Sequence, residues 1–291
     1  MSIDYDSLRA LRFPRIERSY TIRDTMLYAL GLGLGSDPVD PRQLEYVYEK
    51  NLKALPTMPV VLGYLGFWVA DLPTGIDSKM VLAGEQRLTL HSAVPIEGTV
   101  VTEVRVVSVT DKGPGRGAVV TTEAVMRNKN SGELISTSEY MLFCRGDGGY
   151  SAAPGQRSDP GYSMGEPTPE RTADRVIDIP TRPEMGLVYR LSADMNKLHA
   201  DPETARAAGF ERPILHGLAT FGVAGRAILH NCCGDEPRRL RRIAARFSRP
   251  TYPGDTIRVE VWEREGGVQF RARALERELD VLTHGFADIG D

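Results

Sequence analysis

The sequence predicts an α+β protein in which a helical part followed by an antiparallel sheet is built twice. Two observations carry this prediction: helical periodicity gives way to strand alternation in each half, and a stretch rich in Gly, Pro and Ser separates the halves. The 291 residues are enough for two cores of roughly 130 residues each. We therefore expect two related halves.

In the first half, a helix is expected over RDTMLYALGLG, and the apolar segment PVVLGYLGFWVADLP follows later in the chain. From Gln86 to Arg145 the apolar residues alternate as they do in strands. The alternating segments are TVVTEVRVVSVT, GAVVTTEAVMRN and LISTSEYMLFC, with a turn at KNSGE before the last. This pattern predicts a helix laid before a long antiparallel meander.

A linker is expected after the meander, because residues 146–178 are rich in Gly, Pro, Ser and charge. We place the first half at residues 1–148, the linker at 149–178 and the second half at 179–291. Beyond the linker the order recurs, with helices around Asp201–Gly209 and Gly217–Asn231. Strands are then expected at RIAARFSRP, DTIRVEVWERE, VQFRARALER and DVLTHGFADI.

A local echo supports the repetition. The segments LHSAVPIEGTVVTEVRV and FSRPTYPGDTIRVEVWE share a strand, a proline, a turn glycine and an alternating valine strand. The architecture in which a central helix is wrapped by a long antiparallel sheet, built twice, is the double hotdog. A fold of this kind does not by itself determine a function.

Composition excludes several classes of protein. No apolar run approaches the ~20 residues that a membrane helix needs, and the first twenty residues lack the apolar core of a secretory signal. Cys144, Cys232 and Cys233 have no spacing typical of a zinc site or a disulfide framework, so we expect a reducing cytoplasm. The formal charge of −3 argues against a general nucleic-acid binder.

Candidate catalytic residues crowd into the segment YRLSADMNKLHAD. It offers Asp194, Asn196 and His199 between a strand-like VYRLS and a helix. Asp201 reads as the N-cap of that helix, with Pro202 at its first position and Gly209 at its end. Taken singly, Asp194 is interpreted as a turn residue and His199 as a structural histidine. Together, a carboxylate and an imidazole five residues apart can act on one water as acid and base, with Asn196 to orient it.

Gly217 stands at the predicted start of the next helix, in ILHGLATFG. Free backbone N–H groups and the helix dipole face outward there, and a glycine lets a substrate oxygen approach closely. The same N–H would stabilise a negative charge that develops on such an oxygen during a reaction. His216, just before it, is interpreted as a packing or capping residue.

This segment resembles the hydratase 2 motif of the MaoC-like family, which includes the hydratase unit of peroxisomal multifunctional enzyme type 2. The family pattern is Y-R-L-S-G-D-x-N-P-L-H followed by G-F, P-I-L-H-G-L and T-x-G. This sequence has YRLSADMNKLH, GF and PILHGLATFG. The resemblance extends over nearly the whole chain, through RDTMLYALGLG, GEQ, DKG, RGDGG and ARFSRPTYPGDT.

The resemblance implies an enzyme, a hydro-lyase that adds water to trans-2-enoyl-CoA to give (R)-3-hydroxyacyl-CoA, as in fatty-acid β-oxidation. Asp194 and His199 would then be the catalytic pair, Asn196 a positioning residue and Gly217 the oxyanion donor. The first half would be a degenerate hotdog that widens the acyl tunnel. Residues that would line the coenzyme A or acyl site are Gly84, Lys112 and Phe247.

Lys112, in a DKG turn, is equally interpretable as a plain hairpin residue. Three positions depart from the family pattern: Ala193 replaces a glycine, Lys197 a proline, and Ala83 a histidine that often precedes GEQ. Ala193 is expected to shift Asp194 if the glycine served a special backbone angle. Lys197 is expected to loosen the loop or to pair with the coenzyme.

Two other functions stay open beside hydration. A hotdog thioesterase would use an acid and an activated water on the thioester carbonyl, and a catalytically silent acyl-CoA-binding protein would bind without turnover. No cofactor or metal is implied, because GLGLG at 31–35 follows a helix rather than a strand and Cys232 and Cys233 have no ligand at a suitable spacing. The resemblance also implies a homodimer.

Overall fold

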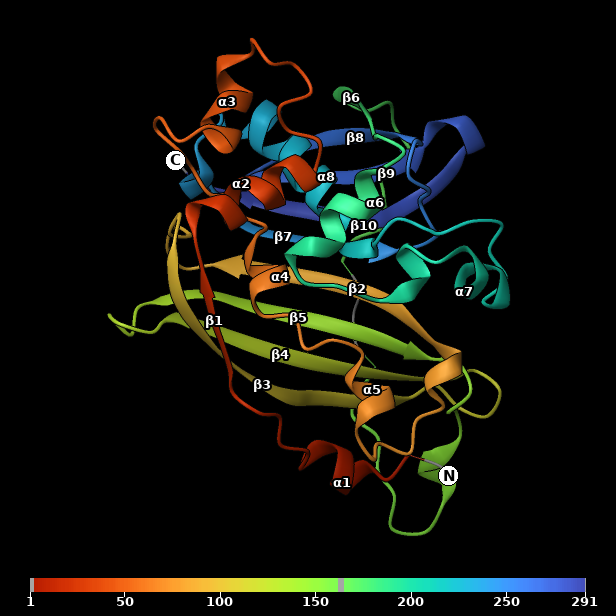
Figure 1. Cartoon of the computed structure of the whole chain (residues 1–291). Coiled ribbons are helices and arrows are strands. Elements are labelled where there is room, and N and C mark those ends of the chain that lie inside the picture. The colour runs from red at the N-terminus through yellow and green to blue at the C-terminus, as the bar shows by residue number, and fades with distance from the viewer. Residues whose placement is uncertain (1–2, 162–164, 291) are drawn as a thin grey trace.

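The computed structural model describes residues 3–161 and 165–290. Residues 1–2 and 291 of the two predicted halves, and residues 162–164 of the predicted linker, lie outside the described part. The described strands form one ten-stranded antiparallel sheet in the order β1-β3-β4-β5-β2-β7-β10-β9-β8-β6. Figure 1 shows most of the helices gathered on one side of this curved sheet.

The strands are β1 (Ile16–Tyr20), β2 (Val81–Leu90), β3 (Gly98–Asp111), β4 (Ala118–Asn128), β5 (Leu134–Cys144), β6 (Arg175–Pro180), β7 (Leu240–Phe247), β8 (Thr256–Arg264), β9 (Gly267–Ala274) and β10 (Leu279–Ile289). The α-helices are α1 (Tyr5–Arg9), α2 (Ile22–Gly31), α3 (Pro41–Val47), α4 (Pro59–Leu62), α5 (Trp68–Asp71), α6 (Met185–Tyr189), α7 (Pro202–Ala207) and α8 (Gly217–Cys232). Two short 3₁₀ turns matter for the site: η3 (Arg190–Ser192) and η4 (Lys197–His199).

The sheet is a repeat, which confirms the predicted double hotdog. The first half has the strand order β1-β3-β4-β5-β2, and the second half repeats it as β6-β8-β9-β10-β7. The two inner strands, β2 and β7, pair in antiparallel fashion, with Glu85 opposite Arg246 and Leu88 opposite Ile243. The two echoing sequence segments span the equivalent connections from β2 to β3 and from β7 to β8.

The helices do not repeat as closely as the strands. The second half has the expected central helix, α8, with 16 residues, whereas the longest helix between Tyr5 and Cys144 is α2, with ten. The end of α2 lies against α8, because a Cβ added at Gly222 would come within 2.8 Å of Leu32. Short α4 and α5 are left to cover the inner face of the first half (Figure 1).

The buried side chains form two clusters. The larger one surrounds α8 and includes Phe221 and Ile228 together with Leu88 of β2 and Ile243 of β7. The smaller one joins α1 and α5 to the inner face of β3, β4 and β5, and its members include Leu8, Trp68, Val109, Val120 and Leu142. The first half therefore buries its inner face with short segments instead of a long helix.

Local predictions around α7 are confirmed. The Asp201 side chain accepts the Glu203 N–H at 3.0 Å, and Pro202 opens the helix. Gly209 follows the helix at φ +86°, a left-handed angle that favours glycine. The strand-like interpretation of VYRLS is wrong: these residues lie in α6 and η3. Their β-branched and aromatic composition favours strands, but α6 packs against α2, where a Cβ at Gly31 would lie 3.2 Å from Tyr189 Cα.

The predicted linker is partly structured. Strand β6 begins at Arg175, inside the range expected to be linker, and pairs with β8. Earlier in the range, Asp159 accepts the Val109 N–H at 2.8 Å and the Tyr5 hydroxyl at 2.7 Å. These bonds tie the described linker residues to β3 and α1. No helix in the described residues is long and apolar enough to cross a membrane.

Phe221→Ala is expected to lower the free energy of unfolding by about 3–5 kcal/mol. The Phe221 side chain of α8 is fully buried in the larger core cluster, and its loss leaves a cavity. Urea unfolding followed by circular dichroism measures the change. Leu30→Ala in α2, where the side chain is 49% exposed, is the matched control and should change stability by less than about 0.5 kcal/mol. Equal losses in both variants would contradict this account of the core.

Candidate active site

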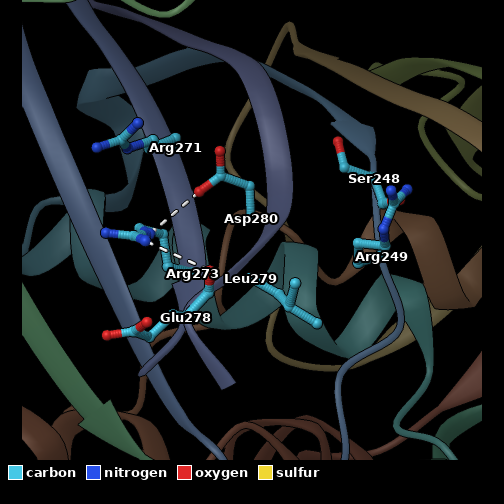
Figure 2. A pocket seen from close by; sticks show the side chains of 7 residues that line it. All are labelled: Ser248, Arg249, Arg271, Arg273, Glu278, Leu279 and Asp280. Carbon is cyan, nitrogen blue, oxygen red and sulfur yellow. Dashed lines mark hydrogen bonds and ion pairs between the residues drawn. The ribbon is translucent and has the colours of Figure 1, made fainter. Parts of the chain in front are cut away.

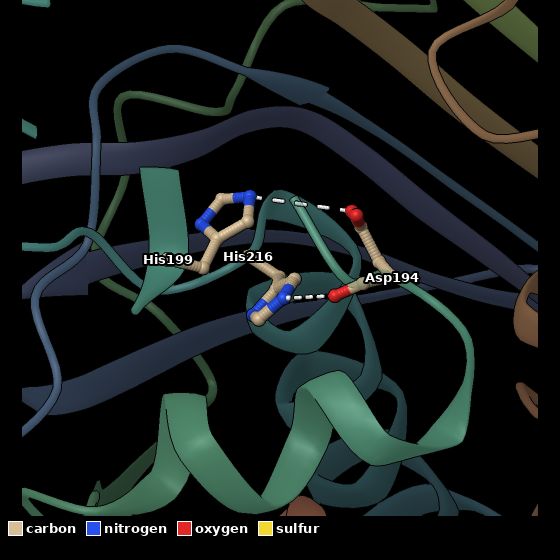
Figure 3. A group of neighbouring side chains, drawn as sticks. All are labelled: Asp194, His199 and His216. Atoms are coloured by element: carbon tan, nitrogen blue, oxygen red, sulfur yellow. Dashed lines mark hydrogen bonds and ion pairs between the residues drawn. The ribbon is translucent and has the colours of Figure 1, made fainter. Parts of the chain in front are cut away.

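The site forms where the loop between α6 and α8 folds back over the start of α8. Asp194 and His199 come from this loop, and His216 directly precedes Gly217, the first residue of α8. One ligand atom from each of Asp194, His199 and His216 lies within 4.8 Å of the others. Figure 3 shows the Asp194 carboxylate facing the edge of the His199 ring. The structure thus brings together the two residues predicted to be the catalytic pair.

His199 has a defined tautomer. Its Nδ1 lies 2.9 Å from the Ile214 carbonyl oxygen, which can only accept, so Nδ1 carries the proton. Burial lowers the pKa of this imidazole below its usual value, although the Ile214 carbonyl and the Asp194 charge oppose the shift. The neutral ring therefore presents the Nε2 lone pair to Asp194. This nitrogen is ready to accept a proton.

Asp194 is held by two hydrogen bonds. One carboxylate oxygen accepts the Asn196 N–H at 3.1 Å, and the Asp194 carbonyl oxygen accepts the His216 Nε2–H at 3.0 Å. The second carboxylate oxygen lies 4.0 Å from His199 Nε2, and both side chains are nearly buried, 13% and 9% exposed. This separation is too long for a direct hydrogen bond and suits one bridging water.

His216 does more than pack. Its ring stacks on the His199 ring with centroids 3.7 Å apart, and it is 1% exposed. Burial, together with the neighbouring His199, lowers its pKa to about 3, so the ring is neutral near pH 7 and Nε2 keeps its proton for the Asp194 carbonyl. The sequence indicated a packing or capping residue, and the structure shows a packing residue that also positions Asp194.

Gly217 is the first residue of α8, so its N–H has no partner within the helix. A Cβ at this position would lie 3.2 Å from the Phe247 ring, which leaves glycine as the residue that fits without movement. Gly84 occupies a bulge of β2 between Ala83 and Glu85, and Glu85 is opposite Arg246, the neighbour of Phe247. Gly217 and Phe247 are therefore in contact, and Gly84 lies one residue beyond the paired residues of β2 and β7.

The other predicted residues lie further from the pair. Lys112 is exposed in the turn that joins β3 to β4, and the structure does not bring it to Asp194. The Asn196 side chain is also exposed, and its oxygen accepts the Leu198 N–H at 3.0 Å, so it caps η4. Ala193 has φ −176°, which does not require glycine, and Lys197 is exposed at the start of η4.

Tyr64 and Tyr140 are neighbours of Asp194 that the sequence did not indicate. Burial raises the pKa of both hydroxyls above their usual value, and the negative charge of Asp194 adds to the shift in each. Tyr64 follows α4 and Tyr140 lies in β5, so both belong to the first half. The residues around Tyr64 and Tyr140 in the sequence give no sign that either side chain lies near Asp194, which is much further along the chain. The first half thus contributes two hydroxyl groups to the surroundings of the pair.

The close approach of Asp194, His199 and His216 does not make a good metal site. His216 Nε2 donates its proton to the Asp194 carbonyl oxygen, so this nitrogen has no free lone pair for a metal ion. The other ring nitrogen, Nδ1, lies on the opposite side of the imidazole ring. Two side chains then remain, whereas a catalytic zinc ion usually has three protein ligands. The arrangement fits a water held by two acceptors better than it fits a cation.

A separate cleft with a volume of about 380 Å³ lies where β7 ends beside β9 and β10 (Figure 2). Ser248 and Arg249 form one side of it and Arg273 and Asp280 the other, and the last two are paired at 3.2 Å. Neither Asp194 nor His199 lines this cleft. It is a charged surface feature that begins one residue after Phe247.

A double hotdog that carries an aspartate and a histidine on the loop before its central helix defines a hydro-lyase of the MaoC-like class. Residues 19–146 match the family described as MFE-2 hydratase 2 N-terminal domain, and residues 165–284 match the MaoC like domain. The chain belongs to the MaoC-like hydratase 2 family, as its nearly full-length similarity to known members shows.

Three relatives illustrate the similarity. The peroxisomal enoyl-CoA hydratase 2 of Arabidopsis thaliana is 33% identical over 300 residues, covering 98% of this chain and 94% of its own. The enoyl-CoA hydratase ChsH3 of Mycobacterium tuberculosis is 36% identical over 269 residues, covering 90% of each chain. The crystal structure of a MaoC-like dehydratase from Phytophthora capsici has a TM-score of 0.84 at 29% identity, covering 98% of both chains.

The free energy of unfolding is expected to fall as the pH drops from 6.5 to 5. The pKa of His216 is about 6.5 in the unfolded chain and is lowered to about 3 in the folded protein. At a pH between these two pKa values, the unfolded chain binds a proton that the folded chain does not. The loss is up to about 1.4 kcal/mol per pH unit for this group. Urea unfolding at several pH values measures it.

His216→Gln is expected to flatten this dependence, because the variant has one buried imidazole fewer. His91→Gln, which removes an exposed histidine, is the control and should keep the wild-type slope. A wild-type slope in His216→Gln would show that His216 does not stay neutral in the folded protein.

Proposed function

We propose that this chain hydrates trans-2-enoyl thioesters of coenzyme A to (R)-3-hydroxyacyl-CoA, and catalyses the reverse dehydration. The observation that carries the proposal is the 4.0 Å gap between His199 Nε2 and the Asp194 carboxylate. Both groups are acceptors, so one water donates a hydrogen to each and its oxygen lone pair is left facing the substrate. Relatives named as enoyl-CoA hydratases support the choice of substrate.

In the proposed reaction the water oxygen attacks the β-carbon while the Asp194–His199 pair accepts one of its protons. The electron pair of the carbon–carbon double bond moves toward the thioester, whose oxygen becomes an enolate oxygen. A proton from the same pair then reaches the α-carbon, so that H and OH are both added on the face where the water was held. The neutral, unprotonated state of His199 Nε2 supports its readiness to accept that proton.

The enolate oxygen is proposed to lie at the start of α8. The Gly217 N–H and the positive end of a 16-residue helix both stabilise negative charge there. Phe247, whose ring packs on Gly217, would hold the thioester against this N–H. Asn196 is proposed to act mainly through its backbone N–H to Asp194, with its side-chain amide available to the water or substrate.

We further propose that residues 1–148 accommodate the acyl chain and residues 179–291 supply the chemistry, joined by the linker at 149–178. Gly84 and Phe247 would line the passage for coenzyme A, and exposed Lys112 would meet its phosphates. We place the protein in the cytoplasm, where thiols stay reduced. Cys144 and Cys233 are buried, and burial raises the pKa of each thiol to about 12, which fits unpaired, unreactive cysteines.

A homodimer is also proposed. Leu187, Leu191 and Met195 are each more than half exposed along α6, η3 and the loop that follows. Such a row of apolar side chains is typical of a surface that another chain covers. Light scattering after size-exclusion chromatography tests this, and a monomer at micromolar concentration would contradict it.

Asp194→Asn and His199→Gln are each expected to lower kcat for crotonyl-CoA hydration by about 10³-fold or more, because either change removes one acceptor of the catalytic water. The loss of enoyl absorbance measures turnover, and circular dichroism checks the fold. Asp201→Asn is the matched control: it changes a carboxylate of the same segment, keeps a good N-cap and should retain near-normal activity. Near-normal turnover in both catalytic variants would overturn the assignment.

The same assay separates the other functions. Free thiol released as the absorbance falls would indicate a thioesterase, and a rise in Tm with crotonyl-CoA without any absorbance change would indicate a silent acyl-CoA-binding protein. Chiral analysis of the product must give the (R)-alcohol if the water is added on the proposed face.

Lys112→Ala is expected to raise KM for crotonyl-CoA about three- to tenfold, because its ammonium would contact a phosphate of the coenzyme in a solvated setting. KM for the crotonyl thioester of N-acetylcysteamine, which has no phosphates, should not change. Lys50→Ala, an exposed lysine after α3, is the control. An unchanged KM for crotonyl-CoA would mean that Lys112 is a plain hairpin residue.

A further inference from the structure

A small cavity lies in the first half, next to the catalytic pair. Tyr64, Tyr140 and Leu218 form its wall, and Leu218 directly follows Gly217 at the start of α8. The charge of Asp194 also contributes to the raised pKa of the Tyr64 and Tyr140 hydroxyls. The cavity therefore begins beside the place where the reacting carbons would lie.

Trp68 separates this cavity from the smaller core cluster. Its side chain lines the cavity and also belongs to that cluster. Trp68 is 5% exposed, and its ring meets the Phe13 ring edge-on with centroids 5.1 Å apart. Behind it, Val109 and Val120 are fully buried. The inner face of the first half is thus filled beyond Trp68.

The cavity is small. Its volume is about 40 Å³, whereas a cavity of about 150 Å³ holds one benzene molecule. By that comparison it has room for about two carbon atoms beyond the β-carbon. A tail of eight or ten carbons would have to displace α5 or the side chains behind it.

Part of the cavity lining is polar and held by hydrogen bonds. Gln86 Nε2 donates to Ser138 Oγ at 2.7 Å, and Thr122 Oγ1 donates to the Tyr140 carbonyl at 3.3 Å. The rest of the lining is mainly apolar, so the end of a short alkyl chain gains from burial there. The hydrogen bonds make the polar part of the lining resist widening.

We propose that this cavity receives the end of the acyl chain and restricts the substrate to short trans-2-enoyl thioesters of about four or five carbons, with Trp68 as the side chain that sets the limit. The proposal rests on the proposed hydratase function. Short substrates place their last carbons beside Val104 and Ala124, and longer ones meet the indole.

The first test compares trans-2-enoyl-CoA esters of four, six and ten carbons with the unaltered protein. We expect kcat/KM for the ten-carbon ester to be at least about 100-fold below that for crotonyl-CoA. Equal or better hydration of the ten-carbon ester would overturn the size limit and leave the hydratase function standing. Failure to hydrate any of the esters would instead count against the proposed function.

The second test moves the limit in both directions. Trp68→Leu should raise the ratio of kcat/KM for the ten-carbon ester to that for crotonyl-CoA at least tenfold, and Ala124→Leu should lower the ratio of the six-carbon ester to crotonyl-CoA by a similar factor. Phe67→Ala is the matched control, because this neighbouring aromatic is 41% exposed and does not line the cavity. Its profile should equal that of the unaltered protein.

A folded Trp68→Leu protein with an unchanged chain-length profile would overturn the role of Trp68. If circular dichroism shows that Trp68→Leu does not fold, Ala124→Leu decides: an unchanged ratio of six-carbon to four-carbon ester would show that the acyl chain does not enter this cavity.

Discussion

The pairing of β2 with β7 is the interaction on which the rest of the structure depends. It turns two sheets of equal strand order into one continuous sheet, and it sets Glu85 of the first half opposite Arg246 of the second. On the outer face of the same register, the buried Glu85 carboxylate lies 3.4 Å from Arg246 Nε, across the junction. Ion pairs of this kind fix register more than they add stability. A slip of one residue would send Phe247 to the wrong face and leave the start of α8 without its cover.

The chemistry depends on a second constraint, which is that two imidazoles are buried with too few partners to be charged. Each ring uses one N–H on a backbone carbonyl, of Ile214 for His199 and of Asp194 for His216. Burial keeps both rings neutral, and the stacked geometry keeps the His199 lone pair aimed at the Asp194 carboxylate. The loop thus sets the orientation of both acceptors before any substrate arrives, so little reorganisation is needed during the reaction.

The features that sequence reasoning predicted well are those set by nearby residues. The cap at Asp201, the glycine after α7 and the start of α8 at Gly217 depend on a few positions each, and all are confirmed. VYRLS was assigned wrongly because its composition favours strands, while contact with α2 holds it as a helix. Tyr64 could not be predicted beside Asp194, because only the folding of the first half onto the second brings them together. The same holds for the start of β6, whose side chains are mostly exposed.

The difference between a repeated sheet and unrepeated helices has a consequence for how the molecule binds. In a fully symmetric double hotdog, the junction would look the same from either end, and a ligand bound across it could lie in two opposite directions. Here one end has the start of α8 and the other has α4, α5 and the core behind them. The junction therefore has polarity, with a head end and a tail end, and a ligand that lies across it meets different surroundings in the two directions.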